Sequence, residues 1–376
     1  MMSHRSKPRD QSRQTFTSPG LSDFEPIGYS AATGGWVVRG VAEGHQILNS
    51  ENFGLDVYDE IEADHAKVHT FMMAAPPLHL TYRRALATAF HRAVVARMET
   101  TILDPAAGAT AEAVIRRIKE EGSAALVTEC IWPYQSSVIY HLSGIARDAG
   151  DEIVAGFRLL HAVSAAQSDH DPRDVTAYVH GRTAELLGDA RSRGAGLLPD
   201  ILATPEIAAL DDEEYAMMFL GFFRTLAVRI GHDLPATLLR RIASLASVQH
   251  ELRRSPALSY SAANEAVRMQ DWGVIPRRVT AECRVGGKRL RLGDNVFILL
   301  GDAGKDPRLF TEPDTFRPDR PYLDRQLAFG AGEHRCPGAH FARAMAARLA
   351  LAILSRTRQI TLTARDDGTD RLVVDA

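Results

Sequence analysis

The sequence predicts a mainly α-helical body with a small β region near its carboxyl-terminal end, and three observations support this prediction. Long stretches of the 376-residue chain space apolar side chains three or four positions apart, as in an amphipathic helix. Strand-like alternation around the Gly286–Gly287 turn gathers after Arg268. The composition, 45% hydrophobic and 24% charged, is that of a globular protein with enough apolar material for a core.

The first half of the chain is expected to begin with a tail and continue as helices. Residues 1–20 are polar and are expected to form a mobile tail ahead of a single domain over residues 21–376. A short strand is expected at 34–38, and the pattern over 41–48 predicts a helix. From 76 to 145 the apolar spacing is mostly helical.

The second half holds the longest helical pattern and the expected strands. Residues 211–246 form that pattern; it starts with two aspartates, and Pro235 is expected to kink or break it. Strands are expected at 279–285 and 295–300, and the proline-marked segment 306–321 is expected to be a loop. The closing helix is marked by apolar side chains four positions apart, at Phe341, Met345, Leu349 and Ile353.

Charge, targeting signals and cysteine count narrow the class of protein. The net charge of −3 argues against nucleic acid as the main partner. The polar amino terminus lacks the apolar core of a signal peptide, and no apolar run is long enough to span a membrane. Cys130, Cys283 and Cys336 lie far apart and form neither a disulfide framework nor a CxxC metal site, so we expect a reducing, cytoplasmic setting.

The most informative segment is the ten-residue run Phe-Gly-Ala-Gly-Glu-His-Arg-Cys-Pro-Gly, residues 329–338. It places Cys336 in a glycine-rich loop just ahead of a helix expected to begin near Pro337. Backbone N–H groups of such a loop and the positive end of the helix dipole stabilise a thiolate. Gly330, Gly332 and Gly338 are expected to supply close approach and unusual dihedral angles. A structural cysteine beside a glycine turn is the alternative, and the full pattern favours a metal-ligating thiolate.

This run resembles the haem-ligand signature of cytochrome P450s of the bacterial soluble type, with Cys336 at the position of the iron ligand and Phe329, Gly330 and Gly338 among the cofactor-contacting residues. The resemblance covers roughly residues 21–376 and implies a cytochrome P450 fold. In that fold, haem b lies between a long distal helix and the proximal cysteine loop.

Further motifs carry the same resemblance. Glu265 and Arg268 match the family's ExxR motif, and Arg320 in a Phe-Arg-Pro-Asp-Arg segment is expected to complete a buried Glu-Arg-Arg cluster. The Gly-Lys-Asp-Pro turn at 304–307 is similar to the family's Asn-Arg-Asp-Pro turn.

The two haem propionates need cationic or N–H partners. His79 and Arg83, four positions apart on one helical face, match the family segment that supplies two of them. The resemblance also assigns a propionate contact to His334 and one to Arg278, with Arg277 as the alternative to Arg278.

The distal helix departs from the family pattern, in which an acid and a threonine relay protons. An ungapped alignment places Leu226–Gly231 there, with Arg229 as a candidate to bind a substrate carboxylate or a peroxide-derived anion. A second alignment uses Gly231-His232-Asp233, and neither one supplies the threonine. The alternative is that Arg229 lies on the helix surface and binds no ligand.

The resemblance implies a haem-thiolate monooxygenase or oxidase that acts on a small molecule, expected in specialised metabolism. The atypical distal helix leaves coupling, desaturation, nitration or peroxygenation open. Electrons are expected from a ferredoxin and its reductase, docking near Arg335, Arg343 and Lys305, or from peroxide. The other hypothesis is a catalytically silent helper of a biosynthetic enzyme.

Overall fold

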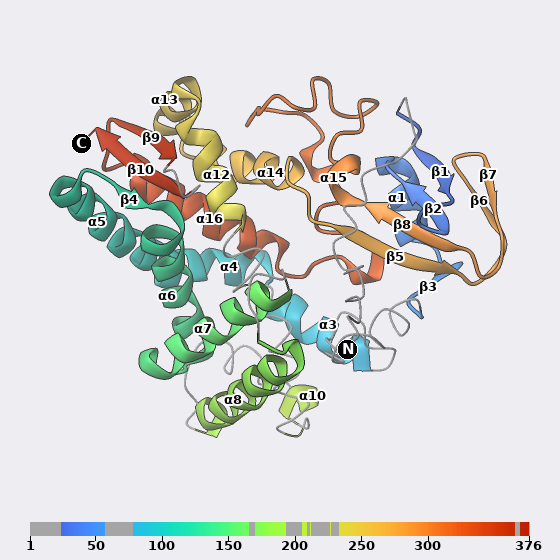
Figure 1. Cartoon of the computed structure of the whole chain (residues 1–376), viewed down its shortest axis with the longest axis horizontal. Helices are drawn as coiled ribbons and strands as arrows, with labels where there is room; N and C mark the ends of the chain where they lie inside the picture. Colours follow the sequence, from blue (N-terminus) through green and yellow to red (C-terminus); the bar gives the residue numbers. More distant parts are fainter. Residues whose placement is uncertain are drawn as a thin grey trace, which may run out of the picture.

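The protein, analysed as a computed structural model, is a mainly helical body with small sheets at two edges (Figure 1). The structure describes residues 24–56, 78–164, 170–192, 205–208, 233–364 and 369–375, together with Asp211 and Leu226. The helical body and the small sheets confirm the predicted fold class, mainly α with a small β region. The tail expected at 1–20 lies outside the described residues.

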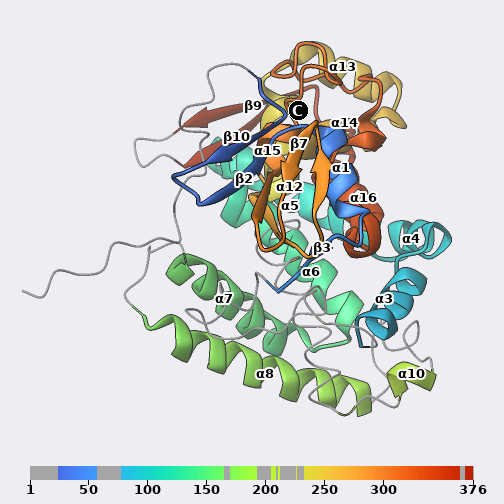
Figure 2. The same ribbon diagram turned by 90° about the vertical axis from the view of Figure 1, so that its right-hand side faces the viewer.

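The helices of the first half of the chain form the first group. Its members are α1 (Val41–Leu48), α3 (Leu78–Ala89), α4 (Arg92–Met98), η2 (Glu99–Leu103), α5 (Asp104–Glu121), η3 (Leu126–Ile131), α6 (Trp132–Ser143), α7 (Arg147–Ser164) and α8 (Pro172–Ser192). Prolines in the first turns of α5 and α6 and left-handed glycines after their last turns set the ends of these two helices. Helices α7 and α8 pack side by side as an outer layer (Figure 2).

The helices of the second half of the chain form the second group. Its members are α10 (Pro205–Ala208), α12 (Asp233–Ala243), α13 (Ala246–Arg254), α14 (Leu258–Arg268), α15 (Leu300–Ala303), η5 (Leu323–Arg325), η6 (Gly332–His334) and α16 (Ala339–Leu354). Helix α16 lies at the centre and packs against α5, α12 and α14. Among the described residues, no helix is both long and apolar enough to cross a bilayer.

The apolar side chains spaced four apart on the closing helix face the core, as their spacing predicted. The four side chains that predicted this helix, Phe341, Met345, Leu349 and Ile353, are all buried in the main core. The helix starts at Ala339, with Gly338 as its N-cap, two residues after Pro337, near which its start was expected.

The strands form three small sheets. A five-stranded sheet has the order β1 (Ile27–Ser30), β2 (Gly35–Val38), β8 (Asn295–Leu299), β5 (Val274–Val279) and β3 (Phe53–Gly54), with β2 and β8 parallel. The second sheet has the order β4 (Ala124–Ala125), β10 (Asp370–Asp375) and β9 (Gln359–Ala364). The third is the hairpin of β6 (Cys283–Val285) and β7 (Lys288–Leu290).

The single strand predicted at 279–285 is wrong. The chain leaves β5 at Val279, bends, and re-enters a separate strand, β6, at Cys283. The Gly286–Gly287 turn, in left-handed conformation, joins β6 to β7, whereas β8 pairs with β5. Alternation of apolar residues continues across the bend, so pattern alone could not show that the two halves choose different partners.

Pro235 lies in helix α12, whose described residues run from Asp233 to Ala243, and it is buried. Residues 227–232 lie outside the described residues, so the predicted kink is not tested there.

The Gly-Lys-Asp-Pro turn ties α15 to α1. The buried Asp306 carboxylate accepts from the Val41 N–H at 2.9 Å and from Arg308, whose guanidinium also pairs with Glu43 at 2.7 Å. Burial raises the pKa of Asp306, but the hydrogen bonds from Arg308 and Val41 outweigh burial and hold that pKa below its ordinary value. Arg308 likewise lowers the pKa of Glu43.

This pairing predicts a pH-dependent stability. Because the folded pKa values of Asp306 and Glu43 are depressed, their contribution is complete above the ordinary carboxyl values of about 4 and is lost as pH falls below them. We expect Asp306→Asn to lower the free energy of unfolding at pH 7 by about 2 kcal/mol and to flatten its acid-side pH dependence. Urea titrations between pH 7 and pH 3 measure both, and Asp319→Asn, in an exposed pair, is the matched control. Parallel pH profiles for wild type and Asp306→Asn would contradict the prediction.

Candidate functional site

The cysteine loop is closed by its own backbone. The Cys336 N–H donates to the Phe329 carbonyl at 2.8 Å, and the loop leads directly into α16. Gly330 and Gly332 have φ of 66° and 67°, in the left-handed region that glycine adopts without strain. A β-carbon on Gly332 would lie 2.0 Å from the Leu48 carbonyl oxygen, so that position also requires glycine for close packing.

Gly338 serves the loop differently from the prediction. Its φ of −84° is ordinary, so the expectation of an unusual dihedral at this position is wrong. Its backbone N–H instead hydrogen-bonds the Cys336 sulfur. A β-carbon built on Gly338 meets no heavy atom within 4 Å.

Two kinds of influence act on the pKa of Cys336 in opposite directions. Burial raises the pKa of the Cys336 thiol, while the Gly338 N–H and the charges of Arg83, Arg343 and Arg335 act to lower it. Burial is the largest of these influences on the pKa of Cys336. One backbone donor and the charges of three arginines acting on the half-buried Cys336 are suited to a thiolate that a metal ion holds deprotonated.

Helix α3 brings two basic side chains to this loop. His79 is 4% exposed, and its ring lies 4.2 Å, centroid to centroid, from that of His334. Arg83, one turn further along α3, donates to the Arg335 carbonyl. Burial and the charge of Arg83 lower the pKa of His79. The residues predicted from spacing on α3 and from the loop, His79, Arg83 and His334, are thus brought together.

Strand β5 separates the two candidate arginines. Arg277 is 5% exposed, whereas Arg278 is half-buried with its Nε 3.6 Å from the Asp56 carboxylate. Side chains two apart on a strand share a face, so Arg277 shares the face of Ile275. A β-carbon built on Gly330 lies 3.8 Å from Ile275 Cδ1. The face of β5 that meets the cysteine loop is therefore that of Arg277, and strand alternation is the signal that could have found it.

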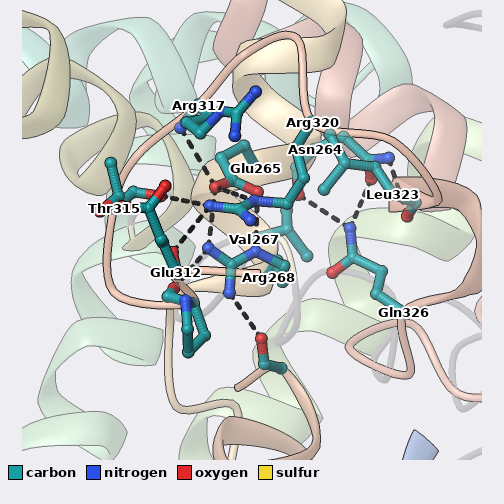
Figure 3. Close-up of polar contacts among 12 residues, drawn as sticks. Asn264, Glu265, Val267, Arg268, Glu312, Thr315, Arg317, Arg320, Leu323 and Gln326 are labelled. Atoms are coloured by element: carbon teal, nitrogen blue, oxygen red, sulfur yellow. Dashed lines mark hydrogen bonds and ion pairs between the residues drawn. The ribbon is translucent and has the colours of Figure 1, made fainter. Parts of the chain in front are cut away.

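Glu265 on α14 lies at the centre of a fully buried ion cluster (Figure 3). Its carboxylate accepts from Arg268 at 2.7 and 2.8 Å and from Arg320 at 2.8 Å. The side chains of Glu265 and Arg268 are 0% exposed, and that of Arg320 is 2% exposed. The structure thus joins the three residues that the motifs named, across 55 positions of sequence.

The remaining donors of both arginines fasten the 304–315 loop. Arg268 donates to the carbonyls of Gly304 at 2.6 Å and Pro313 at 2.7 Å, and its guanidinium lies 5.2 Å from the Phe310 ring centroid. Arg320 donates to the carbonyls of Thr311, Glu312 and Thr315. Glu312 holds an unfavourable positive φ of 48°, which these contacts maintain.

Most of the distal helix, including Arg229, lies outside the described residues. Leu226 is described and buried, and its carbonyl accepts from Gln135 Nε2 at 2.7 Å. Thr237, in the described helix α12 that follows this segment, donates to Gln270 at 2.7 Å.

The three cations expected on a docking face differ in their surroundings. Arg335 is exposed, and Lys305 pairs with Asp314 at 3.0 Å on the surface. Arg343 is half-buried and donates to Asn264 at 3.0 Å. Asn264 stands directly before Glu265, and sequence reasoning gave it no role.

Comparisons with known proteins agree with this geometry. The Cytochrome P450 family model matches residues 247–366. Cytochrome P450 109 of Bacillus spizizenii is 26% identical over 306 residues, 78% of this chain and 73% of the relative. The Mycinamicin VIII C21 methyl hydroxylase of Micromonospora griseorubida is 27% identical over 294 residues, 76% and 71% of the two chains. The crystal structure of CalO2 aligns with a TM-score of 0.76 at 20% identity over 93% of both chains, which shows a common fold.

The matched region contains the cysteine loop, the Glu265 cluster and α16, and the shared fold extends over nearly the whole chain. The chain belongs to the cytochrome P450 family of haem-dependent oxidoreductases.

Proposed function

We propose that this protein is a haem-thiolate monooxygenase or oxidase, organised as one domain over residues 21–376, that oxidises a small molecule of specialised metabolism. The observation that carries the proposal is the Cys336 thiol, held at the start of α16 with the Gly338 N–H on its sulfur. The mycinamicin hydroxylase relative supports the substrate class.

The residues around Cys336 fit a haem b. Iron needs an axial ligand and the two propionates need cationic partners. Cys336 is the ligand in this proposal, with Phe329, Gly330 and Gly338 in the same loop, and a β-carbon built on Gly338 would meet no heavy atom within 4 Å. Four basic side chains would hold the propionates: His79, Arg83, His334 and Arg277. We assign the β5 contact to Arg277 in preference to Arg278, the sequence-based choice, because Arg277 is buried on the loop-facing side of the strand.

Once bound, haem supplies the redox chemistry that activates oxygen or peroxide. The chain's own residues set the conditions. Cys336 would hold the iron through its thiolate, which would supply electron density to that iron. The Gly338 N–H orients that thiolate, and the Glu265 cluster fixes the loop that precedes it. At Arg229 we propose binding of a substrate carboxylate or another anion.

Electrons would come from a ferredoxin and its reductase, with peroxide as the other route. Arg335 and Lys305 are exposed cations that suit an acidic donor protein, and electrostatic steering would accelerate the encounter. A donor titration at increasing ionic strength tests this route, and turnover with peroxide alone tests the other.

The difference spectrum of carbon monoxide bound to the reduced holoprotein tests the proposed function. A long-wavelength Soret band, the feature that gives the P450 family its name, is the expected result because it requires thiolate ligation. Absence of haem after expression with haem precursor, or a band of the nitrogen-ligated type in the intact wild-type protein, would refute the proposal.

The two β5 arginines provide a matched pair for the cofactor contact. We expect Arg277→Ala to accelerate haem loss to apomyoglobin by about tenfold, since one buried charge-assisted hydrogen bond contributes about 1.5 kcal/mol. Arg278→Ala should change the rate less than about twofold, because that side chain faces Asp56. A larger effect for Arg278→Ala would restore the sequence-based choice.

A further inference from the structure

Arg343 is a cation held inside the protein near Cys336. It lies two turns beyond the cysteine, in the first turns of α16, and is half-buried. Its Nη1 donates to Asn264 Oδ1 at 3.0 Å, and its guanidinium carbon lies 5.3 Å from the Phe329 ring centroid. Phe329 is the residue whose carbonyl accepts the Cys336 N–H, so Arg343 packs directly on the loop that presents the thiol.

The orientation of Asn264 is set by its other hydrogen bonds (Figure 3). Its Nδ2 donates to the Leu323 carbonyl at 3.1 Å, and Gln326 Nε2 donates to its Oδ1 at 2.8 Å. A carbonyl can only accept and the Arg343 guanidinium can only donate, so the amide oxygen must face Arg343. Asn264 therefore satisfies one N–H of Arg343 and leaves the positive charge uncancelled.

Within the described part of the chain, no carboxylate forms an ion pair with Arg343. The charged groups that act on it are the cations Arg335 and Arg92, and the ionisable groups Tyr260 and Cys336. Its Nε is buried and has no acceptor among the described residues. Burial is the main cause that lowers the pKa of Arg343. A buried cation without a counter-charge destabilises the folded protein unless an anion lies nearby.

We propose that Arg343 raises the reduction potential of the haem iron bound to Cys336. Its side chain is held by the neutral Asn264, so its positive charge stays uncancelled and acts on the iron site. This inference rests on the proposed function. Reduction adds one electron to the iron site and makes it more negative by one charge. A fixed cation in a partly buried position favours the reduced form, with little screening by salt. Had residue 264 been a carboxylate, its charge would cancel most of this effect.

Spectroelectrochemical titration of the holoprotein tests the inference through four variants. Arg343→Gln deletes the charge, and we expect a roughly tenfold shift of the one-electron equilibrium toward the ferric form, about 59 mV. Asn264→Asp keeps Arg343 and cancels its charge, so it should shift the equilibrium in the same direction. Arg343→Lys keeps the charge and should shift it less than about twofold. Arg335→Gln, an equal charge deletion at an exposed neighbour of Cys336, should give a small shift that disappears in high salt.

The pattern over these variants decides the outcome. Equal shifts for Arg343→Gln and Arg335→Gln would overturn the proposal, as would an unchanged or raised potential in Asn264→Asp. Asn264→Asp and Arg343→Lys keep the test decisive if Arg343→Gln fails to fold. The carbon monoxide band is recorded for each variant: a thiolate-type band with no potential shift refutes this inference alone, whereas loss of that band in wild type refutes the proposed function.

Discussion

Replacing Cys336 with alanine is expected to abolish the thiolate-type carbon monoxide band and to reduce substrate oxidation by more than about a thousandfold. The reason is the position of this thiol: it lies beside the Gly338 N–H, and the charges of Arg83, Arg343 and Arg335 act on it. Alanine removes the ligand atom and leaves the loop backbone, including the Cys336 N–H to Phe329 hydrogen bond, able to form. Haem retention, the absorption spectrum and product formation measure the effect.

The chain provides a matched control for this substitution. Cys283 is a half-buried free thiol in the β6–β7 hairpin, to which the cysteine loop does not belong. Cys283→Ala should therefore keep the wild-type spectrum and rate. If Cys336→Ala retained the thiolate-type band, or Cys283→Ala lost it, another ligand would have to be assigned.

Replacing Glu265 with glutamine is expected to lower the free energy of unfolding by about 3–5 kcal/mol, because it leaves two buried arginines without their counter-charge. Glutamine matches the shape of glutamate, so the loss is one of charge and not of volume. Arg268 and Arg320 each donate to this carboxylate, and both hold carbonyls of the 304–315 loop. We expect that loop to loosen and haem incorporation to fall with stability.

Urea unfolding of the holoprotein at pH 7 measures this change, with protease susceptibility of the 304–315 loop as a local readout. Glu282→Gln is the matched control: Glu282 also pairs with an arginine, Arg289 at 2.7 Å, but in the open. An exposed pair contributes little because water solvates both partners. Similar losses for Glu265→Gln and Glu282→Gln would show that burial of the cluster has no energetic consequence.

Neighbouring residues on α14 carry out two separate tasks. Glu265 supplies a charge where two arginines need one, and Asn264 supplies a neutral oxygen where Arg343 keeps its charge. The Glu265 carboxylate stabilises the folded protein, and we propose that the neutral Asn264 keeps the reduction potential of the iron high. A single helix turn therefore connects the loop fastened by Arg268 and Arg320 with the helix that follows Cys336.

The sequence by itself determined the parts whose chemistry is local. Apolar residues four apart predicted α16, and each of these side chains is buried. The order of residues in the cysteine loop identified the candidate ligand, because glycine, histidine and cysteine at fixed spacing are a strong signal. Spacing on α3 placed His79 and Arg83 on one face, where the structure has them.

Tertiary structure decided the parts that depend on which segments meet. The choice between Arg277 and Arg278 required knowing which face of β5 meets the loop at Gly330. The role of Asn264 required η5 and α16 to converge on α14 from positions 59 and 79 residues away. Local pattern determines the conformation and the available chemistry of a segment. Burial, and with it the strength of a charge, depends on partners from distant parts of the chain that no local pattern contains.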